Sequence, residues 1–302
     1  ILARVNGIIK SEKVFSTIPL QKNISPEDSI YGIDSNLNNG SVKLIKRIGL
    51  TRIRPHGDLA WGSVEATKGN FVFPDYRINR AKSMGLQPYG FLSVTPTWAG
   101  PNSTSLPNSL ADWENYVYKV VDHYKNDIKE WEVYNEPYFQ LNSSQYLSLV
   151  NSARAGADRA DPTAKLIGWS GTVPVKSTDN YYYKDLKDQL IQKLNILSAH
   201  YYPTRDGLTG TRFYDTLRNH TQVISGGNMR VWNTEGGAIG GPTFYKTKSD
   251  YDANDSRNDQ TADVPRFFAN HKAADAPLYY YWLNFPSTGD HSPGYSYSWT
   301  LN

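Results

Sequence analysis

Two glutamates stand directly after strand-like runs of residues, where a carboxylate could do acid–base or nucleophilic chemistry. Glu136 follows the run at 131–135 (W-E-V-Y-N) and precedes Pro137. Glu235 follows the run at 231–234 (V-W-N-T) and precedes two glycines. Proline and paired glycines interrupt regular structure, so each carboxylate is expected at the point where a strand stops.

Two carboxylates that face each other across a pocket can hydrolyse a glycosidic bond. One must be protonated to donate to the leaving oxygen, while the other is ionised and attacks the anomeric carbon or stabilises positive charge there. A low dielectric and mutual repulsion separate the pKa values of such a pair, which allows both roles near neutral pH. Alternatively, each glutamate could simply pair with a nearby arginine, but two acids in matching contexts favour the catalytic interpretation.

Eight short apolar runs that alternate with helix-period segments are available to position these acids. In the clearest helix, around 113–124, apolar residues recur at i, i+3, i+4, i+7 and i+11, with Ser109 as its cap. Asn142 and Gln145 have capping-box spacing before a second helix. Further helical segments are expected at 42–48, 75–85, 186–194, 212–224 and 261–273. The expected strands are 30–33, 51–54, 88–94, 131–135, 166–168, 196–201, 229–234 and 278–283.

This alternation predicts an α/β fold with parallel strands, and specifically a single (β/α)8 TIM barrel. A doubly wound sheet usually has a glycine-rich phosphate loop after its first strand, and 32–34 is not one. In a barrel, the site lies at the carboxyl ends of the strands, and strands four and seven face each other across its mouth. The barrel is expected to span 29–286, flanked by extensions at 1–28 and 287–302 that could pack beside it.

The tripeptide Asn135-Glu136-Pro137, together with Glu235 on the seventh strand, resembles clan A of the retaining glycoside hydrolases. The resemblance covers about residues 30–285 and is closest to family 39, including its bacterial exopolysaccharide hydrolases, with similar motifs in family 5. The other matching elements, in the expected order, are Arg54, 61–73, 96–98, 200–203 and Trp282.

The resemblance implies that Glu136 is the general acid/base and Glu235 the nucleophile. It implies that Asn135 binds the sugar 2-hydroxyl, and that Tyr202 and Arg54 hold Glu235 ionised and correctly aimed.

Four further residues are expected to contact the sugar or the polar network around it. The resemblance implies that His200 orients the network and that Trp282 forms the floor beneath the sugar that is attacked. Trp98 and Trp169 are candidate stacking platforms for sugar rings.

Several of these assignments have alternatives. Arg52 has the same strand parity as Arg54, which is favoured because it lies nearer the strand end. His200 could be a structural histidine at the barrel rim, and Trp98 and Trp169 could both pack in the core.

Other residues near the strand ends are expected to play supporting parts. Trp131 and Trp232 are expected to pack against helices, and Glu132 to belong to a buried polar network. The loop residues His56, Asp58 and Trp61 could line a groove.

The composition suits a carbohydrate-binding globular protein and excludes several other classes. The 302 residues include 22 Tyr and 8 Trp, whose rings can stack on sugars, and the net charge of +3 gives no electrostatic case for nucleic acid. The absence of cysteine excludes disulfides and thiol catalysis, and the six scattered histidines lack metal-ligand spacing. No apolar run approaches the roughly 18 residues of a membrane span. No cofactor or metal is expected, and nothing bears on the oligomeric state.

The expected function is hydrolysis of a bacterial or plant polysaccharide or oligosaccharide, with endo action favoured. The alternatives are an exo-acting β-glycosidase such as a β-xylosidase and an inactive carbohydrate-binding barrel. A barrel lyase or aldolase would need a Schiff-base lysine or a metal at a strand end, and neither is evident. The sequence starts at Ile1 without Met, so a secreted protein, extracellular or on the cell surface, whose signal peptide has been removed is expected.

Overall fold

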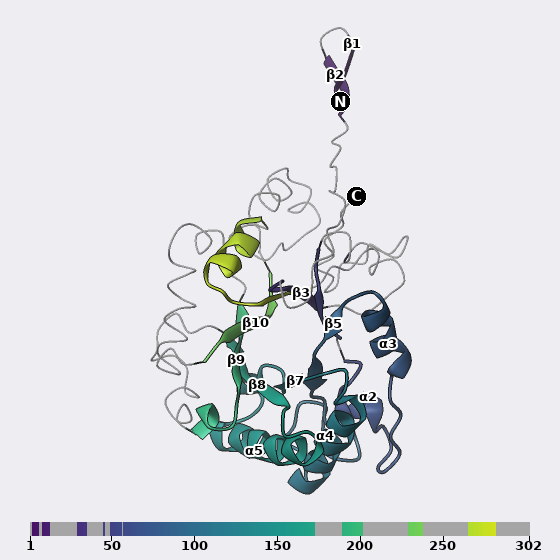
Figure 1. Cartoon of the computed structure of the whole chain (residues 1–302), viewed down its shortest axis with the longest axis vertical. Coiled ribbons are helices and arrows are strands. Elements are labelled where there is room, and N and C mark those ends of the chain that lie inside the picture. The colour runs from purple at the N-terminus through teal and green to yellow at the C-terminus, as the bar shows by residue number, and fades with distance from the viewer. Residues whose placement is uncertain are drawn as a thin grey trace.

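The strands of the barrel close into one ring (Figure 1). The computed structural model describes residues 2–5, 8–12, 29–34, 45, 49–55, 57–172, 189–201, 229–237 and 265–281. Within the ring every strand pairing is parallel. The strands are β3 (Tyr31–Asp34), β4 (Arg52–Arg54), β5 (Gln87–Pro88), β6 (Gly90–Leu92), β7 (Glu130–Val133), β8 (Lys165–Thr172), β9 (Ile196–Tyr201), β10 (Val231–Gly236) and β11 (Leu278–Tyr281).

Ring closure depends on one short segment that pairs on both sides. The sheet order is β5-β4-β3-β11-β10-β9-β8-β7-β6, so β5 and β6 are its two ends. Only Tyr89 separates these two ends along the chain. Since β5 pairs with β4 and β6 pairs with β7, this one segment closes the ring. Counting β5 and β6 as one strand gives eight, which confirms the expected (β/α)8 barrel.

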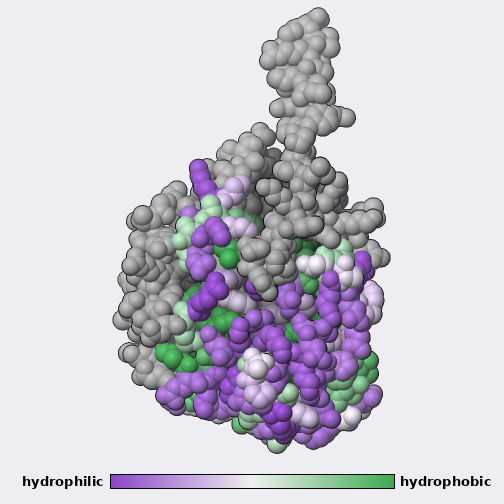
Figure 2. All heavy atoms as spheres, viewed as in Figure 1, coloured by the Kyte–Doolittle hydropathy of each residue, from purple (hydrophilic) through white to green (hydrophobic). Residues whose placement is uncertain are grey.

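Helices cover the outside of the ring (Figure 1). Ser109 caps α4 by accepting from the backbone N–H of Asp112, and Asn142 with Gln145 forms the expected capping box of α5. Residues 265–273 are also helical, with Pro265 in the first turn as expected. The described surface over α4 and α5 is mostly hydrophilic, as Figure 2 shows. The named helices are α2 (Trp61–Val64), α3 (Asp75–Ser83), α4 (Leu110–Tyr124), the 3-10 turn η1 (Pro137–Phe139) and α5 (Ser143–Ala160).

The main core lies between the ring and its helices. Trp131 on β7 is fully buried there, as expected, and its ring fills the space beside Gly90 on β6. A Cβ atom on Gly90 would lie 1.9 Å from Cε3 of Trp131, so the indole requires glycine at this position. The expectation for Trp232 was wrong: it lies in a separate cluster with Tyr89, Ile167 and Ile196, not against the helices.

Most strand boundaries shift by one to three residues from the expected ones. The largest difference is at β8, which extends over Lys165–Thr172, whereas the sequence indicated 166–168. β10 continues through Glu235, which the sequence placed just after the strand. The expected helix at 212–224 and most of the one at 42–48 lie outside the described residues, whereas 189–191, within the expected helix at 186–194, are helical.

A small sheet lies in the segment expected to be the N-terminal extension. Leu2–Val5 (β1) and Ile8–Glu12 (β2) pair antiparallel and form no part of the barrel sheet. The domain boundaries at 28 and 286 fall outside the described residues and stay a prediction. Among the described residues, no helix has the length and apolar character to cross a membrane.

Candidate active site

Arg54 lies at the centre of a polar cluster inside the barrel. It ends β4 and has no exposed surface. Nη1 donates to Asp34 at 2.6 Å and to Glu235 at 2.9 Å, and Nε donates to Glu132 at 3.0 Å. Nη2 donates to the side-chain oxygen of Asn135 at 2.9 Å. A buried guanidinium is stable only when its charge and donors are matched, and these four partners meet that requirement.

Arg52, the alternative to Arg54, has a different environment. Its Nε donates to the carbonyl oxygen of Ser29 at 3.2 Å, and its guanidinium lies 5.5 Å from the ring centre of Trp232. Of the two arginines, Arg54 is therefore the one that donates to a candidate catalytic glutamate, Glu235.

Glu235 reaches the cluster because a bulge interrupts the alternation of β10. Thr234 points into the barrel, where its hydroxyl donates to Glu132 at 2.6 Å. Strict alternation would turn the next side chain outward. Between Asn233 and Glu235 the register against β9 shifts, so Glu235 can also point inward and accept from Arg54.

Glu136 is positioned by a strained turn after β7. It adopts the left-handed conformation (φ 43°, ψ 54°), and Pro137 begins η1 immediately afterwards. Tyr134 also has a positive φ, of 71°. Each such conformation costs a non-glycine residue on the order of 1–3 kcal/mol, and strain of this kind concentrates at functional sites. The turn places the Glu136 carboxylate 3.0 Å from Nδ1 of His200.

The two candidate catalytic carboxylates lie close together. One oxygen of Glu136 and one of Glu235 lie within 4.8 Å of each other, and Nδ1 of His200 is 3.8 Å from Glu235. Retaining glycosidases hold their carboxyl groups about 5–5.5 Å apart, and inverting ones about 6.5–9.5 Å apart to admit a water molecule. The spacing therefore agrees with a retaining arrangement.

Glu132 is fully buried and belongs to the polar cluster around Arg54. The sequence predicted such a buried polar network for it. Burial opposes its charge, but Arg54 and His200 hold the pKa of Glu132 at about 2. Tyr89 also donates to Glu132, at 3.1 Å.

His200 lies buried among three carboxylates. Burial alone would lower its pKa, but the negative charges of Glu235 and Glu132 and the hydrogen bond with Glu136 raise the pKa of His200 to about 9. The imidazole is therefore a cation at neutral pH.

By distance alone, Glu136, His200 and Glu235 could hold a metal ion. In this structure the same atoms are engaged with one another, because Arg54 donates to an oxygen of Glu235 and Nδ1 of His200 lies 3.0 Å from Glu136. The cluster is consistent with organic acid–base chemistry.

The tryptophans expected at the site behave differently from one another. Trp98 is partly exposed, and its Nε1 donates to the backbone oxygen of Glu65 at 2.8 Å, so it stays a candidate platform. Trp169 is a correction: it is 0% exposed and packs in the main core, where no sugar can reach it. Tyr202 and Trp282 lie outside the described residues.

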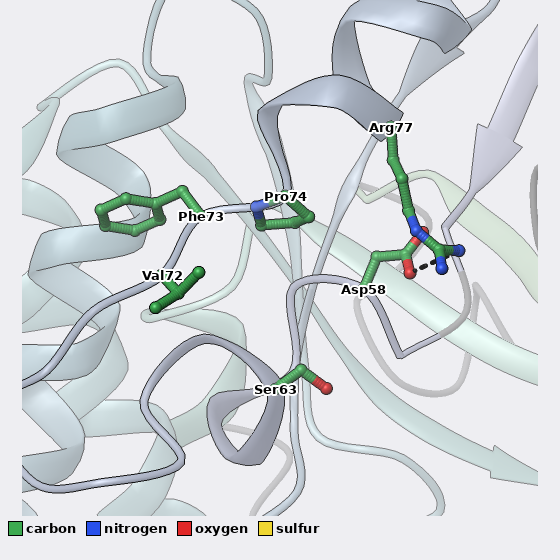
Figure 3. A pocket seen from close by; sticks show the side chains of 6 residues that line it. All are labelled: Asp58, Ser63, Val72, Phe73, Pro74 and Arg77. Atoms are coloured by element: carbon green, nitrogen blue, oxygen red, sulfur yellow. Dashed lines mark ion pairs between the residues drawn. The ribbon is translucent and has the colours of Figure 1, made fainter.

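The loop after β4 was expected to line a groove, and part of it does. A shallow pocket of 290 Å³ is lined by Asp58, whose carboxylate pairs with Arg77 at 3.0 Å (Figure 3). Trp61 is a second correction, because it is fully buried and stacks on Tyr116. His56 lies outside the described residues. None of the six pocket-lining residues belongs to the Arg54 cluster.

Sequence reasoning did not assign roles to three residues that complete the cluster, namely Asp34, Tyr89 and Thr234. Asp34 could have been found as a partner of Arg54, because both end neighbouring strands of the barrel. Thr234 shares the parity of Trp232, which was expected to face the helices, so the same parity misplaced Thr234.

Comparison with known proteins finds similarity to glycoside hydrolases. Residues 34–167, which include Arg54 and Glu136 but end before Glu235, match the model of glycosyl hydrolase family 10. An endo-1,4-beta-xylanase A from Phanerodontia chrysosporium is 30% identical over 129 residues, which are 38% of this chain and 32% of that protein. The chain therefore matches about a third of the length of this relative.

Solved structures show the same fold. A family 39 glycoside hydrolase from Bacteroides cellulosilyticus WH2 has a TM-score of 0.69 at 21% identity, covering 90% of this chain and 59% of that one. Xylanase 10B from Thermotoga maritima has a TM-score of 0.61 at 15% identity, covering 83% of this chain and 82% of that one. The expected likeness to family 39 holds for the fold, whereas the sequence match is to family 10. Both families belong to clan A, so the comparisons confirm the resemblance of this chain to the clan A glycoside hydrolases.

Proposed function

We propose that this chain is a retaining glycoside hydrolase in which Glu235 is the nucleophile and Glu136 the general acid/base. The observation that carries the proposal is the short separation of these two carboxylates, within 4.8 Å, with Arg54 on one and His200 on the other. An ion pair with Arg54 keeps Glu235 available for attack on the anomeric carbon. Glu136 protonates the leaving oxygen and then activates the water that releases the sugar.

The charges of the cluster suit this reaction. Arg54 and His200 supply two positive charges, and Asp34, Glu132 and Glu235 supply three negative ones. When Glu136 carries its proton, these described side chains leave one net negative charge. A transition state with oxocarbenium character is positively charged and is stabilised by such a field.

The substrate that we propose is a plant or bacterial polysaccharide cut internally, with xylan as the first candidate. Support comes from the name of the matched relative, an endo-1,4-beta-xylanase. Asn135 binds the sugar 2-hydroxyl, and the partly exposed Trp98 offers an aromatic face. A polymeric substrate of this kind is met outside the cell, so we place the protein extracellularly or at the cell surface.

The test is incubation of the full chain with xylan and a panel of other plant and bacterial polysaccharides, with mass spectrometry of the products. Glu235→Gln is the matched control, because it keeps the shape of the side chain and removes the charge. Oligosaccharides from the wild type alone support endo hydrolysis, whereas single sugars alone indicate an exo-acting β-glycosidase. Binding without products from either protein would overturn the proposal in favour of an inactive carbohydrate-binding barrel.

A further inference from the structure

The bulge that aims Glu235 interrupts the backbone ladder between β9 and β10. Asn233 pairs with Ala199 and Glu235 pairs with His200, so Thr234 is the extra residue between the two pairs. A buried backbone carbonyl needs a hydrogen-bond donor, and a bulge disturbs the regular supply of donors from the neighbouring strand. Something other than strand pairing must therefore stabilise the chain here.

The side chain of Asn233 supplies these donors. It is fully buried, and in the amide orientation that gives both its nitrogen and its oxygen partners, the NH2 donates to the carbonyl oxygens of Glu235 at 2.8 Å and Ala199 at 3.0 Å. One side chain thus joins β9 and β10 on either side of the extra residue. The remaining amide oxygen faces Nε2 of His271 at 2.9 Å.

His271 holds the Asn233 amide from the helix at 265–273. It is fully buried, and burial lowers the pKa of His271 to about 3, so the ring is neutral and carries one proton. Nε2 faces Asn233, and Nδ1 lies 2.7 Å from the backbone oxygen of Phe267. These two acceptors compete for the single proton.

The two carbonyls at the bulge decide the competition. With the proton on Nε2, the amide oxygen of Asn233 accepts it and both amide N–H groups reach Glu235 and Ala199, which satisfies three hydrogen bonds. With the proton on Nδ1, the amide must turn around and place its oxygen against both carbonyls. The first arrangement leaves one pair of acceptors in contact, Nδ1 of His271 and the Phe267 oxygen. The second leaves two, the Asn233 oxygen against each carbonyl oxygen, so the first is favoured.

We propose that Asn233 and His271 are positioning residues that hold the β10 bulge and thereby aim the carboxylate of Glu235. Neither side chain faces the substrate, and both act through the backbone of the nucleophile. Without the Asn233 amide, β10 can relax towards regular alternation, which turns residue 235 out of the barrel. A displacement of about 1 Å of a reacting group can cost about 100-fold in rate. The inference rests on the proposed function, in which Glu235 attacks the sugar.

The test measures attack by Glu235 alone. 2-Deoxy-2-fluoro-xylosyl fluoride carries its own leaving group, so trapping of the glycosyl-enzyme needs the nucleophile but little help from Glu136. We expect Asn233→Ala to be labelled about 10- to 100-fold more slowly than the wild type, as followed by mass spectrometry of the intact protein. Ser198→Ala is the matched control: Ser198 is also fully buried on β9 and donates to a strand carbonyl, that of Gly168 at 2.9 Å, away from the bulge.

A second pair of variants protects the test against a folding defect in Asn233→Ala. His271→Gln keeps a donor for the Asn233 oxygen, and we expect it to be labelled within about threefold of the wild-type rate. His271→Leu removes the donor, and we expect slow labelling in a protein whose circular dichroism is unchanged.

The outcomes separate the inference from the proposed function. If folded Asn233→Ala and His271→Leu are labelled on Glu235 as fast as the wild type, the inference is overturned. The proposed function then still stands. Equal slowing in Ser198→Ala would also overturn it, because the effect would then reflect general loosening of the barrel. A wild type that is neither labelled nor active on any polysaccharide would overturn the proposed function, and the inference with it.

Discussion

Nε2 of His200 lies 3.8 Å from a carboxylate oxygen of Glu132, although Glu132 has no exposed surface and cannot touch a substrate. The opposite nitrogen of the same ring lies 3.0 Å from Glu136. The buried carboxylate therefore helps to fix the charge of a ring that contacts the proposed acid/base. This relationship makes the protonation of His200 dependent on a residue inside the barrel.

The pKa of His200 should fall when Glu132 loses its charge. In the wild type the pKa is about 9, and Glu132→Gln removes one of the carboxylates that raise it. Titration of isotopically labelled histidine by NMR should show His200 losing its proton at a lower pH in the variant. Because the folded pKa lies above the unfolded value of about 6.5, the stability that His200 contributes is complete below pH 6.5 and is lost as the pH rises through about 9. A wild-type titration near pH 6.5 would contradict this account.

Replacement of Arg54 should destabilise the fold as well as abolish activity. Arg54→Met leaves the buried carboxylates of Asp34 and Glu132 without their cation, and breaking a buried ion pair from one side costs about 3–5 kcal/mol. Arg52→Met is the matched control on the same strand, because its guanidinium has one hydrogen bond to a backbone oxygen in place of an ion pair. Urea unfolding at pH 7 should show a much larger loss for Arg54→Met. Equal losses in the two variants would contradict the central place of Arg54.

Small nucleophiles should rescue the two glutamate variants by different stereochemical routes. Glu136→Ala should still form the glycosyl-enzyme from a dinitrophenyl glycoside, whose leaving group needs no proton, and azide should then give a product of retained configuration. Glu235→Ala lacks the nucleophile, so azide should attack the substrate directly and give inverted configuration. NMR of the glycosyl azides distinguishes the two. The same configuration from both variants would contradict the assigned roles.

The close approach of β6 and β7 should make Gly90 intolerant of any side chain. Gly90→Ala places a methyl group inside the ring of Trp131, and overpacking of a core costs about 1–3 kcal/mol or more. Denaturant unfolding should show this loss in the single variant. In the double variant with Trp131→Leu, the added cost of the alanine should fall, because the smaller side chain vacates the space. Additive losses would show that the clash is not the cause.

The order of the elements could be predicted from the sequence because it depends on local patterns. The capping residues of α4 and α5 and the stop at Gly85, with φ of 72°, all act within a few residues of the chain. Glu136 and Glu235 could be placed at the rim for the same reason. A joint role for them could be proposed because strand ends meet at one face of a barrel.

The contacts that tune the site could not be predicted, because they join residues distant in the sequence. Local pattern left Trp169 open between a sugar platform and core packing; its φ of 92° lies in an irregular stretch of β8, and the ring packs in the core. The sequence did not indicate a role for Asn233, because its amide contacts carbonyl oxygens that only the bulge in β10 brings within reach. Bulges and positive φ values change side-chain direction without a clear mark in the sequence.

His271 should make the protein sensitive to mild acid. Burial lowers its folded pKa to about 3, whereas the unfolded chain takes up a proton near pH 6.5, so stability falls as the pH drops between these values. Glu132 contributes acid sensitivity only below its unfolded value of about 4.5, and His200 is protonated in both states below about pH 6.5. Of these three groups, His271 is therefore the one that lowers stability between pH 6.5 and 5, and the loss should be on the order of 1–2 kcal/mol. Urea unfolding across this window should give a steep slope for the wild type and a shallower one for His271→Gln. The comparison uses slopes, so a constant difference in stability between the two proteins does not affect it, and equal slopes would show that His271 is not buried in its neutral form.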